Sequence, residues 1–300
     1  MIVSAPPVVL LTGASTGLGL VLARELIARN DYRLILTARR ESLPRFAELG
    51  IVEDSRIRLR ALDVTNSMER LAVIEEANED WNGVDILINN AGVSIRSVVE
   101  HVSEEDRMAQ MDVNFRSPME LIRLVLPRMR HKREGRIINI SSVGGMMAMP
   151  TMAVYSASKF ALEGATEALW YEVRPWNIKV TLVEPGFINS KGFEKVRFTE
   201  QSAQANDMAL RDYHEHYRHM DRFIEKMMTR TGADPKNVAR VILRTMTRKR
   251  PALRVTATLD AWLFSMVRRF LPRRFYHWLL YRSLPSIAEW GRPRLPGPKG

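Results

Sequence analysis

The stretch that decides the fold reads Val8-Val9-Leu10-Leu11-Thr12-Gly13-Ala14-Ser15-Thr16-Gly17-Leu18-Gly19. Its first four residues form a short apolar run typical of a buried strand, and apolar residues recur at helical spacing from position 20 to position 27. Glycines in the turn between strand and helix let the backbone approach a pyrophosphate, which then lies at the positive end of the helix. This order predicts a dinucleotide-binding turn, although its Gly-x-x-x-Gly-x-Gly spacing differs from the general Gly-x-Gly-x-x-Gly fingerprint.

Strand-like apolar runs recur along the chain and alternate with helix-length stretches. We expect seven strands, at residues 7–12, 32–38, 57–62, 85–88, 136–141, 178–183 and 252–257. All but the last are separated by enough chain for the right-handed crossovers that join parallel strands. The pattern predicts an α/β fold of Rossmann type, with a doubly wound, seven-stranded, mainly parallel sheet, helices on both faces and a C-terminal amphipathic helical extension.

The chain contains no Gly/Ser linker and no internal repeat, which favours a single catalytic domain. We expect this dinucleotide-binding domain to span residues 1–258 and to include a substrate-covering insertion at about 187–232. A basic amphipathic helical extension of the same domain is expected at 259–290. Residues 291–300 are rich in Pro and Gly and are expected to form a disordered tail.

A second motif places Ser142 thirteen residues before Tyr155, and Lys159 four residues after that tyrosine. Positions i and i+4 share a face of a helix, so the phenol and the ammonium would lie together. A free tyrosine has a pKa of about 10, and an adjacent ammonium would lower it toward neutrality. Tyr155 could then act as general acid or base while Ser142 holds the substrate oxygen. The alternative is that Tyr155 and Lys159 are only a surface pair on a helix.

Together these motifs resemble the short-chain dehydrogenase/reductase family over roughly residues 7–190. The sequence around Ser142 and Tyr155 is similar to that of the branch that contains 17β-hydroxysteroid and retinol dehydrogenases. The resemblance implies catalytic roles for Asn114, Ser142, Tyr155 and Lys159, with Asn114 anchoring a proton-relay water and Lys159 orienting a ribose. It also implies cofactor contacts from Gly13, Ser15, Thr16, Gly17, Leu18, Gly19, Asp63, Val64, Asn90, Ala91, Gly92, Tyr155, Lys159, Pro185, Gly186, Ile188 and Ser190.

The end of the second predicted strand bears on the choice of cofactor. Arg39 and Arg40 follow that strand, and no acidic residue occupies positions 37–40. A carboxylate there would bind the ribose hydroxyls of NAD, whereas an arginine accepts the 2′-phosphate of NADP. We therefore expect NADP(H) to be favoured over NAD(H), the alternative being that both arginines are a solvated strand end.

Methionines precede Tyr155 at positions 146, 147, 149 and 152, where a substrate would approach. Methionine adapts to irregular apolar shapes, so we expect a lipophilic substrate in contact with Ser142, Met147, Met149, Tyr155, Phe187 and Phe193. Core or subunit packing is an equally good reading of any single methionine. His214, His216 and His219 do not all share one helical face and lack a zinc-enzyme spacing, so we expect no metal site.

The net charge of +11 is concentrated at the C-terminal end. Residues 240–300 contain fourteen Lys or Arg and two acidic residues, so they carry +12, whereas residues 1–239 carry −1. Large apolar side chains lie between the arginines of 259–282, as in helices at a lipid surface, and charges interrupt every apolar run before it could span a bilayer. Packing on the enzyme or on a second subunit, as a homodimer or homotetramer, is the main alternative to peripheral membrane contact, and nucleic acid is unlikely.

The chain has no cysteine, which excludes disulfides and zinc-thiolate sites. The N-terminus lacks the pattern of a secretory signal, so we expect a cytoplasmic protein, with peripheral membrane association left open. The function predicted is NADP(H)-dependent interconversion of an alcohol and its carbonyl on a steroid-, retinoid- or fatty-type substrate. The alternative is a membrane-associated cofactor-binding scaffold or sensor with little catalysis.

Overall fold

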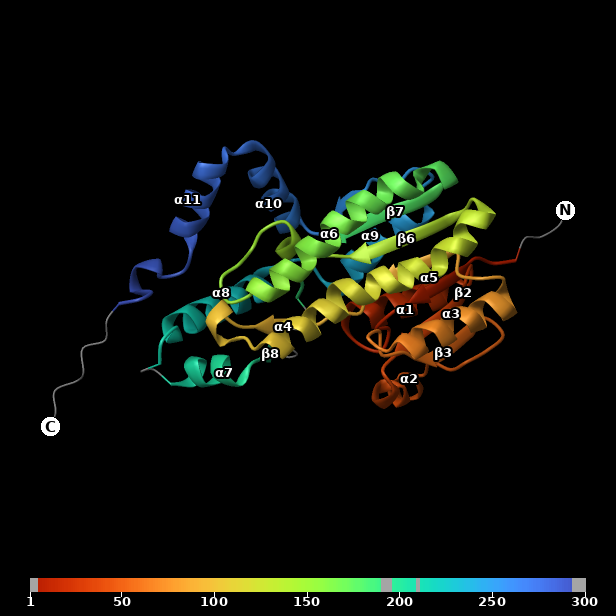
Figure 1. Ribbon diagram of the computed structural model, residues 1–300, viewed down its shortest axis with the longest axis horizontal. Helices are drawn as coiled ribbons and strands as arrows, with labels where there is room; N and C mark the ends of the chain where they lie inside the picture. Colours follow the sequence, from red (N-terminus) through yellow and green to blue (C-terminus); the bar gives the residue numbers. More distant parts are fainter. Residues whose placement is uncertain (1–4, 190–195, 209–210, 293–300) are drawn as a thin grey trace.

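A seven-stranded parallel sheet forms the centre of the computed structural model, which describes residues 5–189, 196–208 and 211–292 (Figure 1). The strand order is β3-β2-β1-β4-β6-β7-β9, and each neighbouring pair is parallel. The strands are β1 (Val8–Leu11), β2 (Arg33–Ala38), β3 (Ile57–Ala61), β4 (Ile86–Asn89), β6 (Gly135–Ile140), β7 (Ile178–Glu184) and β9 (Arg254–Thr256). The predicted Rossmann-type fold is confirmed.

The inner strands are apolar on both faces because helices cover both faces, which is typical of parallel sheets. One core lies between the sheet and helices α1 and α9, and includes Leu22, Leu26, Ile242 and Met246. The other core lies under α3, α5 and α6, and includes Val73, Leu121, Val125 and Leu169. The helices of these layers are α1 (Gly17–Arg29), α2 (Pro44–Glu48), α3 (Ser67–Trp81), α4 (Glu104–Met111), α5 (Ser117–Lys132), α6 (Ala153–Val173) and α9 (Pro235–Thr247).

Two short strands, β5 (Ile95–Arg96) and β8 (Arg197–Phe198), pair in parallel to form a separate small sheet. Neither was expected, because two residues are too few to show the alternation that identifies a strand. Helices α7 (Glu200–Asp207) and α8 (His214–Arg230) follow β8. Tyr217 of α8 is fully buried, and its hydroxyl accepts a hydrogen bond from the Val98 amide at 3.0 Å. The predicted substrate-covering insertion therefore contains two helices, of which α8 is attached to the loop after β5.

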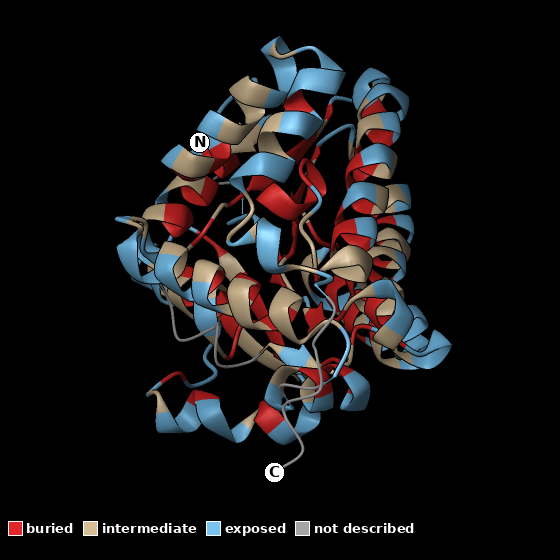
Figure 2. Ribbon diagram, turned by 90° about the vertical axis from the view of Figure 1, so that its left-hand side faces the viewer, coloured by how far each residue is buried: buried red, intermediate tan, exposed pale blue. Residues whose placement is uncertain are grey.

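The chain ends in two helices, α10 (Leu259–Phe270) and α11 (Arg273–Ser283), separated at Leu271 and Pro272, and a 3₁₀ turn (Ile287–Glu289). Figure 1 shows them beside α8, at the end of the molecule that Figure 2 views face-on. Their inner side chains pack against Val143, Met146 and Met147, which follow β6. The predicted C-terminal extension is thus a helical hairpin packed on the enzyme, while the division of the chain into the predicted segments stays a prediction.

The order of the strands places the site. The chain runs outward from β1 to β3 and then returns to β4 on the other side of β1. In such sheets ligands bind beyond the carboxyl ends of the strands where this reversal occurs. The carboxyl ends of β1, β4, β6 and β7 are followed by the glycine turn, Asn90, Ser142 and Pro185, so these predicted site residues meet at one edge.

Candidate active site

The glycine turn after β1 is held by the end of β4. The Thr12 hydroxyl accepts hydrogen bonds from the amides of Asn90 (2.9 Å) and Ala91 (3.0 Å). The Asn90 side chain donates to the carbonyl oxygens of Thr12 (2.9 Å) and Gly13 (3.2 Å). This bonding joins two turns that lie 77 residues apart in sequence. Asn90 therefore maintains the shape of the turn. The sequence predicted only a contact of Asn90 with the cofactor.

Two glycines allow the turn to close so tightly. Gly13 has φ +66°, a conformation that side chains rarely adopt, and a Cβ on Gly19 would lie 2.1 Å from the Gly13 carbonyl oxygen. Thr16 caps α1 in an extended conformation, and no side chain among the described residues bonds to the amides of that N-terminus. Such amides at the positive end of a helix suit a pyrophosphate. The turn therefore fits a dinucleotide, with Ser15, Thr16, Gly17 and Leu18 along its edge.

The predicted adenosine end lies beside the ends of β2 and β3. Arg39 and Arg40 are exposed, and each side chain is close to a glutamate: Arg39 Nε lies 3.1 Å from Glu41 and Arg40 lies 3.9 Å from Glu69. The Asp63 carboxylate accepts hydrogen bonds from the amide and hydroxyl of Thr65, while Val64 is buried. Both arginine side chains extend into solvent, where a phosphate could displace these weak ion pairs.

Ser142 and Tyr155 lie together at the end of β6. The Ser142 hydroxyl accepts a hydrogen bond from the Gly144 amide at 3.1 Å and also bonds to the Tyr155 hydroxyl. A Cβ on Gly144 would lie 2.9 Å from the Tyr155 ring, which shows how closely the turn and the ring approach each other. Loss of water contact raises the pKa of Tyr155, and the bond with Ser142 acts in the opposite direction. At neutral pH the phenol therefore carries its proton.

Lys159 lies on the same face of α6 as Tyr155. Its Nζ donates a hydrogen bond to the Ile140 carbonyl oxygen at 2.9 Å and is 6.0 Å from the centre of the Tyr155 ring. Burial lowers the pKa of Lys159 to about 8, although the charge of Glu163 raises it. The expectation that this ammonium brings the tyrosine pKa down is wrong for the structure as it stands. Burial is the largest cause of the shift in each group, and neither residue is among the groups that act on the pKa of the other.

Asn114 lies in a π-helical turn, Asp112–Arg116, between α4 and α5. Its side chain exchanges two hydrogen bonds of 2.9 Å with the backbone of Val93 and donates to Ser158 Oγ at 3.0 Å. A Cβ on Gly92 would lie 3.3 Å from Asn114 Oδ1 and 3.9 Å from Lys159 Nζ. Asn114 and Lys159 therefore border the same small space beside Gly92, and π-turns of this kind occur often at functional sites.

The loop after β7 completes the site. The Pro185 carbonyl oxygen accepts a hydrogen bond from the Val143 amide at 2.7 Å, so this loop is joined to the end of β6. Asp260 of α10 accepts a bond from the Phe187 amide, and Thr258 accepts one from the Gly186 amide, each at 2.8 Å. Ile188 packs on the core. The predicted contacts Ser190 and Phe193 lie outside the described residues.

An apolar cluster covers the substrate side. Phe187 is buried with Met220 and Ile224 of α8, and Met149, Met152 and Phe264 pack against them. Met147 is buried in the neighbouring cluster under α10 and α11. Of the predicted substrate residues, Met149 and Phe187 thus belong to this cover, and Met147 belongs to the neighbouring cluster. Sequence reasoning missed Phe264, because a single phenylalanine in a basic tail gives no sign of which neighbour it meets.

A charged network behind Lys159 was also missed. Arg254 Nη1 lies 2.5 Å from Glu163 and 2.8 Å from Glu184, and its Nη2 lies 3.0 Å from Glu167. Burial, together with the charge of Glu163, raises the pKa of Glu184 to about 7. A cavity of about 480 Å³ opens beside this network, between α6 and α10, on Glu163 rather than on Tyr155. Of these four residues, only Glu163 could have been linked to the site from the sequence, because it lies four residues after Lys159 and so shares a helical face with it.

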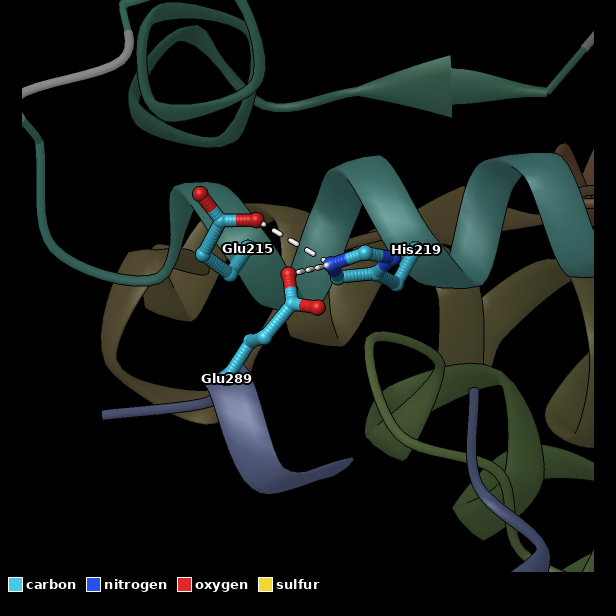
Figure 3. A group of neighbouring side chains, drawn as sticks. All are labelled: Glu215, His219 and Glu289. Atoms are coloured by element: carbon cyan, nitrogen blue, oxygen red, sulfur yellow. Dashed lines mark hydrogen bonds and ion pairs between the residues drawn. The ribbon is translucent and has the colours of Figure 1, made fainter. Parts of the chain in front are cut away.

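Of the three predicted histidines, only His219 belongs to an ion-pair cluster; His214 contacts the Ala205 carbonyl oxygen, and His216 packs against Tyr213 and Trp290. His219 Nε2 lies 3.1 Å from Glu215 and 3.0 Å from Glu289, which belongs to the C-terminal 3₁₀ turn (Figure 3). These three ligand atoms are close enough to hold a metal ion. However, the Arg218 guanidinium lies 2.7 Å from Glu215 and 3.6 Å from Glu289, so a metal ion would have to compete with it for both carboxylates. The sequence could not show this cluster, because Glu289 is 70 residues from His219.

Comparison with known proteins agrees with this geometry. The family model for short chain dehydrogenases matches residues 7–201. The chain belongs to the short-chain dehydrogenase/reductase family. It is therefore an NAD(P)-dependent oxidoreductase that acts on alcohol or ketone groups, as predicted.

Its relatives include enzymes named for lipophilic substrates. The 3-ketodihydrosphingosine reductase of Bacteroides thetaiotaomicron is 36% identical over 276 residues, which cover 92% of this chain and 97% of the relative. Retinol dehydrogenase 8 of Bos taurus is 32% identical over 263 residues, which cover 83% of this chain and 81% of the relative. These similarities confirm the predicted branch of retinol and steroid dehydrogenase-like members.

Solved structures of the family share the fold. A short-chain dehydrogenase from Streptomyces avermitilis superposes with a TM-score of 0.78 at 28% identity, covering 94% of this chain and 98% of its own. A serine dehydrogenase, solved with NADP⁺, has a TM-score of 0.69 at 26% identity and covers 83% of this chain and 93% of its own. A member from Burkholderia phymatum, alike in fold alone, was solved with NAD. Bound cofactors among these neighbours therefore include both dinucleotides.

Proposed function

We propose that this enzyme interconverts an alcohol and its carbonyl on a lipophilic substrate with NADP(H), with Tyr155 as the acid and base. The observation that carries the proposal is the meeting of Ser142, Tyr155, Lys159 and Asn114 at the carboxyl ends of the strands, next to the glycine turn. A binding scaffold would have no need of a hydroxyl, a phenol and a buried ammonium around one point.

Each residue has a distinct task in this proposal. NADP(H), when bound, supplies or accepts the hydride at the reacting carbon. The Tyr155 hydroxyl gives its proton to the substrate oxygen during reduction and takes a proton back during oxidation. Ser142 donates a hydrogen bond to the same oxygen. Lys159 holds a ribose hydroxyl, and the space it shares with Asn114 accepts a water that returns the proton to Tyr155.

The protonation state of Tyr155 supports carbonyl reduction as the favoured direction near neutral pH. Burial raises the pKa of the phenol above its usual value, so near neutral pH Tyr155 carries the proton that the substrate oxygen needs. A carbonyl that receives a hydride needs a proton at its oxygen in the same step. The reverse reaction would require the phenol to lose its proton first, and we expect it to need a higher pH.

Arg39 supports the choice of NADP(H). Its guanidinium extends from the end of β2, and no acidic residue occupies positions 37–40. Among the described residues, its only ion-pair partner is the exposed Glu41. A guanidinium binds a phosphate through two parallel hydrogen bonds, which an exposed glutamate does not outcompete. The 2′-phosphate of NADP would therefore displace Glu41 at little cost.

The cover supports a lipophilic substrate. Methionine and phenylalanine side chains from three separate segments meet in one cluster: Met149 and Met152, Phe187, and Met220, Phe223, Met227 and Met228 of α8. Unbranched thioether side chains adapt to irregular apolar molecules. Two relatives are named for a sphingoid base and for retinol, both long apolar molecules with one oxygen function at the reacting carbon.

The test is Tyr155→Phe, measured with NADPH and a panel of fatty, steroid and retinoid carbonyl compounds. Removing the proton donor should reduce kcat by at least about a thousandfold, because acid catalysis and the hydrogen bond are both lost. NADPH should still bind, as followed by its fluorescence. Tyr171→Phe is the matched control, since Tyr171 lies on the same helix but is exposed to solvent. Native turnover in Tyr155→Phe would refute the assignment.

A further inference from the structure

The C-terminal hairpin has an inner and an outer face. Along α10, Phe264 and Val267 point inward and pack on Met146 and Met147, together with Leu271 at the end of the helix. From α11, Tyr276 and Leu280 join the same cluster. This packing agrees with helical periodicity, because residues three and four positions apart share a face. The opposite side chains of both helices consequently face away from the enzyme.

That outer face is apolar to an unusual degree. Of the fifteen large apolar or tyrosine side chains that are exposed among the described residues, seven lie between positions 259 and 281. They are Leu259, Trp262, Leu263 and Phe270 of α10, and Phe275, Trp278 and Tyr281 of α11. Leu259 is 79% exposed and Phe270 is 71% exposed. Patches of this kind on a folded protein mark a surface that meets a partner.

The charge of the hairpin indicates which partner fits. Five arginines lie between positions 259 and 283, at 268, 269, 273, 274 and 282, against one acidic residue, Asp260. Asp260 bonds to the Phe187 amide on the enzyme side and so does not neutralise the outer face. Among the described residues, no carboxylate forms an ion pair with any of the five arginines. The hairpin is therefore cationic as well as apolar, although Arg268 lies on the side that faces α6.

Three arginines lie over aromatic rings of this region. The Arg269 guanidinium is 5.8 Å from the Phe270 ring centre, and that of Arg282 is 5.5 Å from the Trp278 ring centre. Arg268 lies 5.1 Å from the ring of Phe160 on α6. Arginine stems that lie along apolar surface keep their charged ends at the polar boundary, which is the arrangement of amphipathic helices at a bilayer.

We propose that the outer face of α10 and α11 docks on an anionic lipid surface. Its Trp, Phe and Leu side chains would enter the boundary of the acyl chains, and its arginines would bind the headgroups. No helix among the described residues is long and apolar enough to cross a membrane, so the contact is with the surface. A second copy of the chain fits less well, because a symmetric contact would bring two sets of arginines together.

Docking would also place lipid next to the substrate cover. Phe264 of α10 packs in both apolar clusters, and α10 is bonded through Asp260 to the Phe187 loop. The hairpin would thus lie between the lipid and the methionines before Tyr155. This consequence for substrate delivery rests on the proposed function, whereas docking itself rests on the outer face alone.

The experiment is flotation of the full-length protein with phosphatidylcholine vesicles, with and without phosphatidylserine. We expect the native protein to float only with the anionic vesicles and to be released by salt, since screening weakens the headgroup contacts. A double variant, Trp262→Ser with Trp278→Ser, should bind at least about tenfold more weakly, because two interfacial aromatic side chains are lost. Tyr171→Ser, an equally exposed aromatic change on α6, is the matched control and should float like the native protein.

Several results would overturn the proposal. These are failure of the native protein to float with anionic vesicles, native flotation of the double variant, or a native dimer that the double variant converts to monomer without any vesicle binding. Salt-sensitive retention on duplex DNA in place of vesicle binding would also overturn it. Reduction of the fatty, steroid and retinoid carbonyl panel with NADPH, without vesicles, is measured in parallel and should be unchanged in the double variant. If the native protein reduced no compound of the panel, that result would instead count against the proposed function.

Discussion

The cofactor end and the cover differ in how their shape is maintained. At the cofactor end, the glycine turn and Asn90 are joined by backbone-directed hydrogen bonds of 2.9–3.2 Å, and glycines allow contacts that no side chain would permit. In the cover, Phe187, Phe264 and the methionines of α8 meet through apolar contacts without a regular pattern. Hydrogen bonds and close backbone contacts define one geometry, whereas methionine contacts tolerate several.

This difference fits the two tasks of the enzyme. NAD and NADP contain the same pyrophosphate, so a turn shaped to that group can be narrow. Substrates differ between members, and a cover made of flexible apolar side chains can change without disturbing the strands beneath it. We therefore expect a single added methyl group at the cofactor end to cause a large loss of cofactor affinity. Removing one charge outside the glycine turn should change cofactor binding or turnover less.

The largest effect is expected for Gly19→Ala. The new methyl group would lie 2.1 Å from the Gly13 carbonyl oxygen and 2.6 Å from the Asn90 side chain, so the turn would have to open. We expect NADPH affinity to fall by at least about a hundredfold and the free energy of unfolding to fall by about 1–3 kcal/mol, as in overpacked sites. Isothermal titration with NADPH and urea denaturation measure the two quantities.

Gly164→Ala is the matched control for that change. Gly164 lies within α6, and a Cβ there would meet no atom within 4 Å. Alanine is favoured over glycine in a helix, so this variant should gain about 0.5–1 kcal/mol of stability and bind NADPH normally. If Gly19→Ala and Gly164→Ala bound NADPH with equal affinity, the glycine turn would tolerate an added methyl group. The proposed difference in rigidity between the cofactor end and the cover would then be wrong.

A smaller effect is expected for Arg39→Ala, at the solvent-exposed margin of the cofactor end. The Arg39 side chain is 55% exposed, so its removal should leave stability unchanged. Loss of its bond to the 2′-phosphate should raise KM for NADPH by about tenfold to a hundredfold, a typical cost of a charge-assisted hydrogen bond, and leave KM for NADH nearly constant. Arg45→Ala, a nearby exposed arginine, is the control. An equal rise in KM for NADPH and NADH would show that Arg39 does not bind the 2′-phosphate.

The same contrast explains what the sequence could and could not predict. Each of the seven expected strands is present within two residues of its expected ends, because buried parallel strands are continuous apolar runs. The positions of Tyr155 and Lys159 on one face followed from helical spacing alone. These features are local, since a short stretch of chain contains all the information that determines them.

Features that depend on distant contacts were missed. Asp260 was read only as a charge that interrupts an apolar run, yet it bonds to the Phe187 loop, 73 residues away. Arg254 reaches Glu163 across 91 positions. The direction of the Tyr155 pKa was also missed, because the spacing to Lys159 revealed the neighbouring charge but not the burial that opposes it. Burial and long-range pairing belong to the tertiary structure.

The smallest effect is expected at Glu163, in the Arg254 network behind Lys159. Burial lowers the pKa of Lys159 to about 8, and the negative charge of Glu163 raises it. Glu163→Gln should therefore lower this pKa further, so that Lys159 loses its proton at a lower pH. If the ammonium holds the ribose during carbonyl reduction, kcat/KM should fall above pH 8 in the native enzyme and at a lower pH in the variant. The rate at pH 8 should change by less than about tenfold, because a shift of one pKa unit changes the charged fraction by at most that factor.

Glu167→Gln separates this effect from a general loss of the Arg254 network. Glu167 binds the same guanidinium at 3.0 Å but is not among the groups that act on Lys159, so its variant should keep the native pH profile. A profile measured from roughly pH 6 to 10 with NADPH absorbance distinguishes the two variants on either side of the Lys159 pKa. If both variants moved the descending limb equally, Arg254 rather than the charge of Glu163 would be the cause. If neither moved it, the limb would belong to a group other than Lys159.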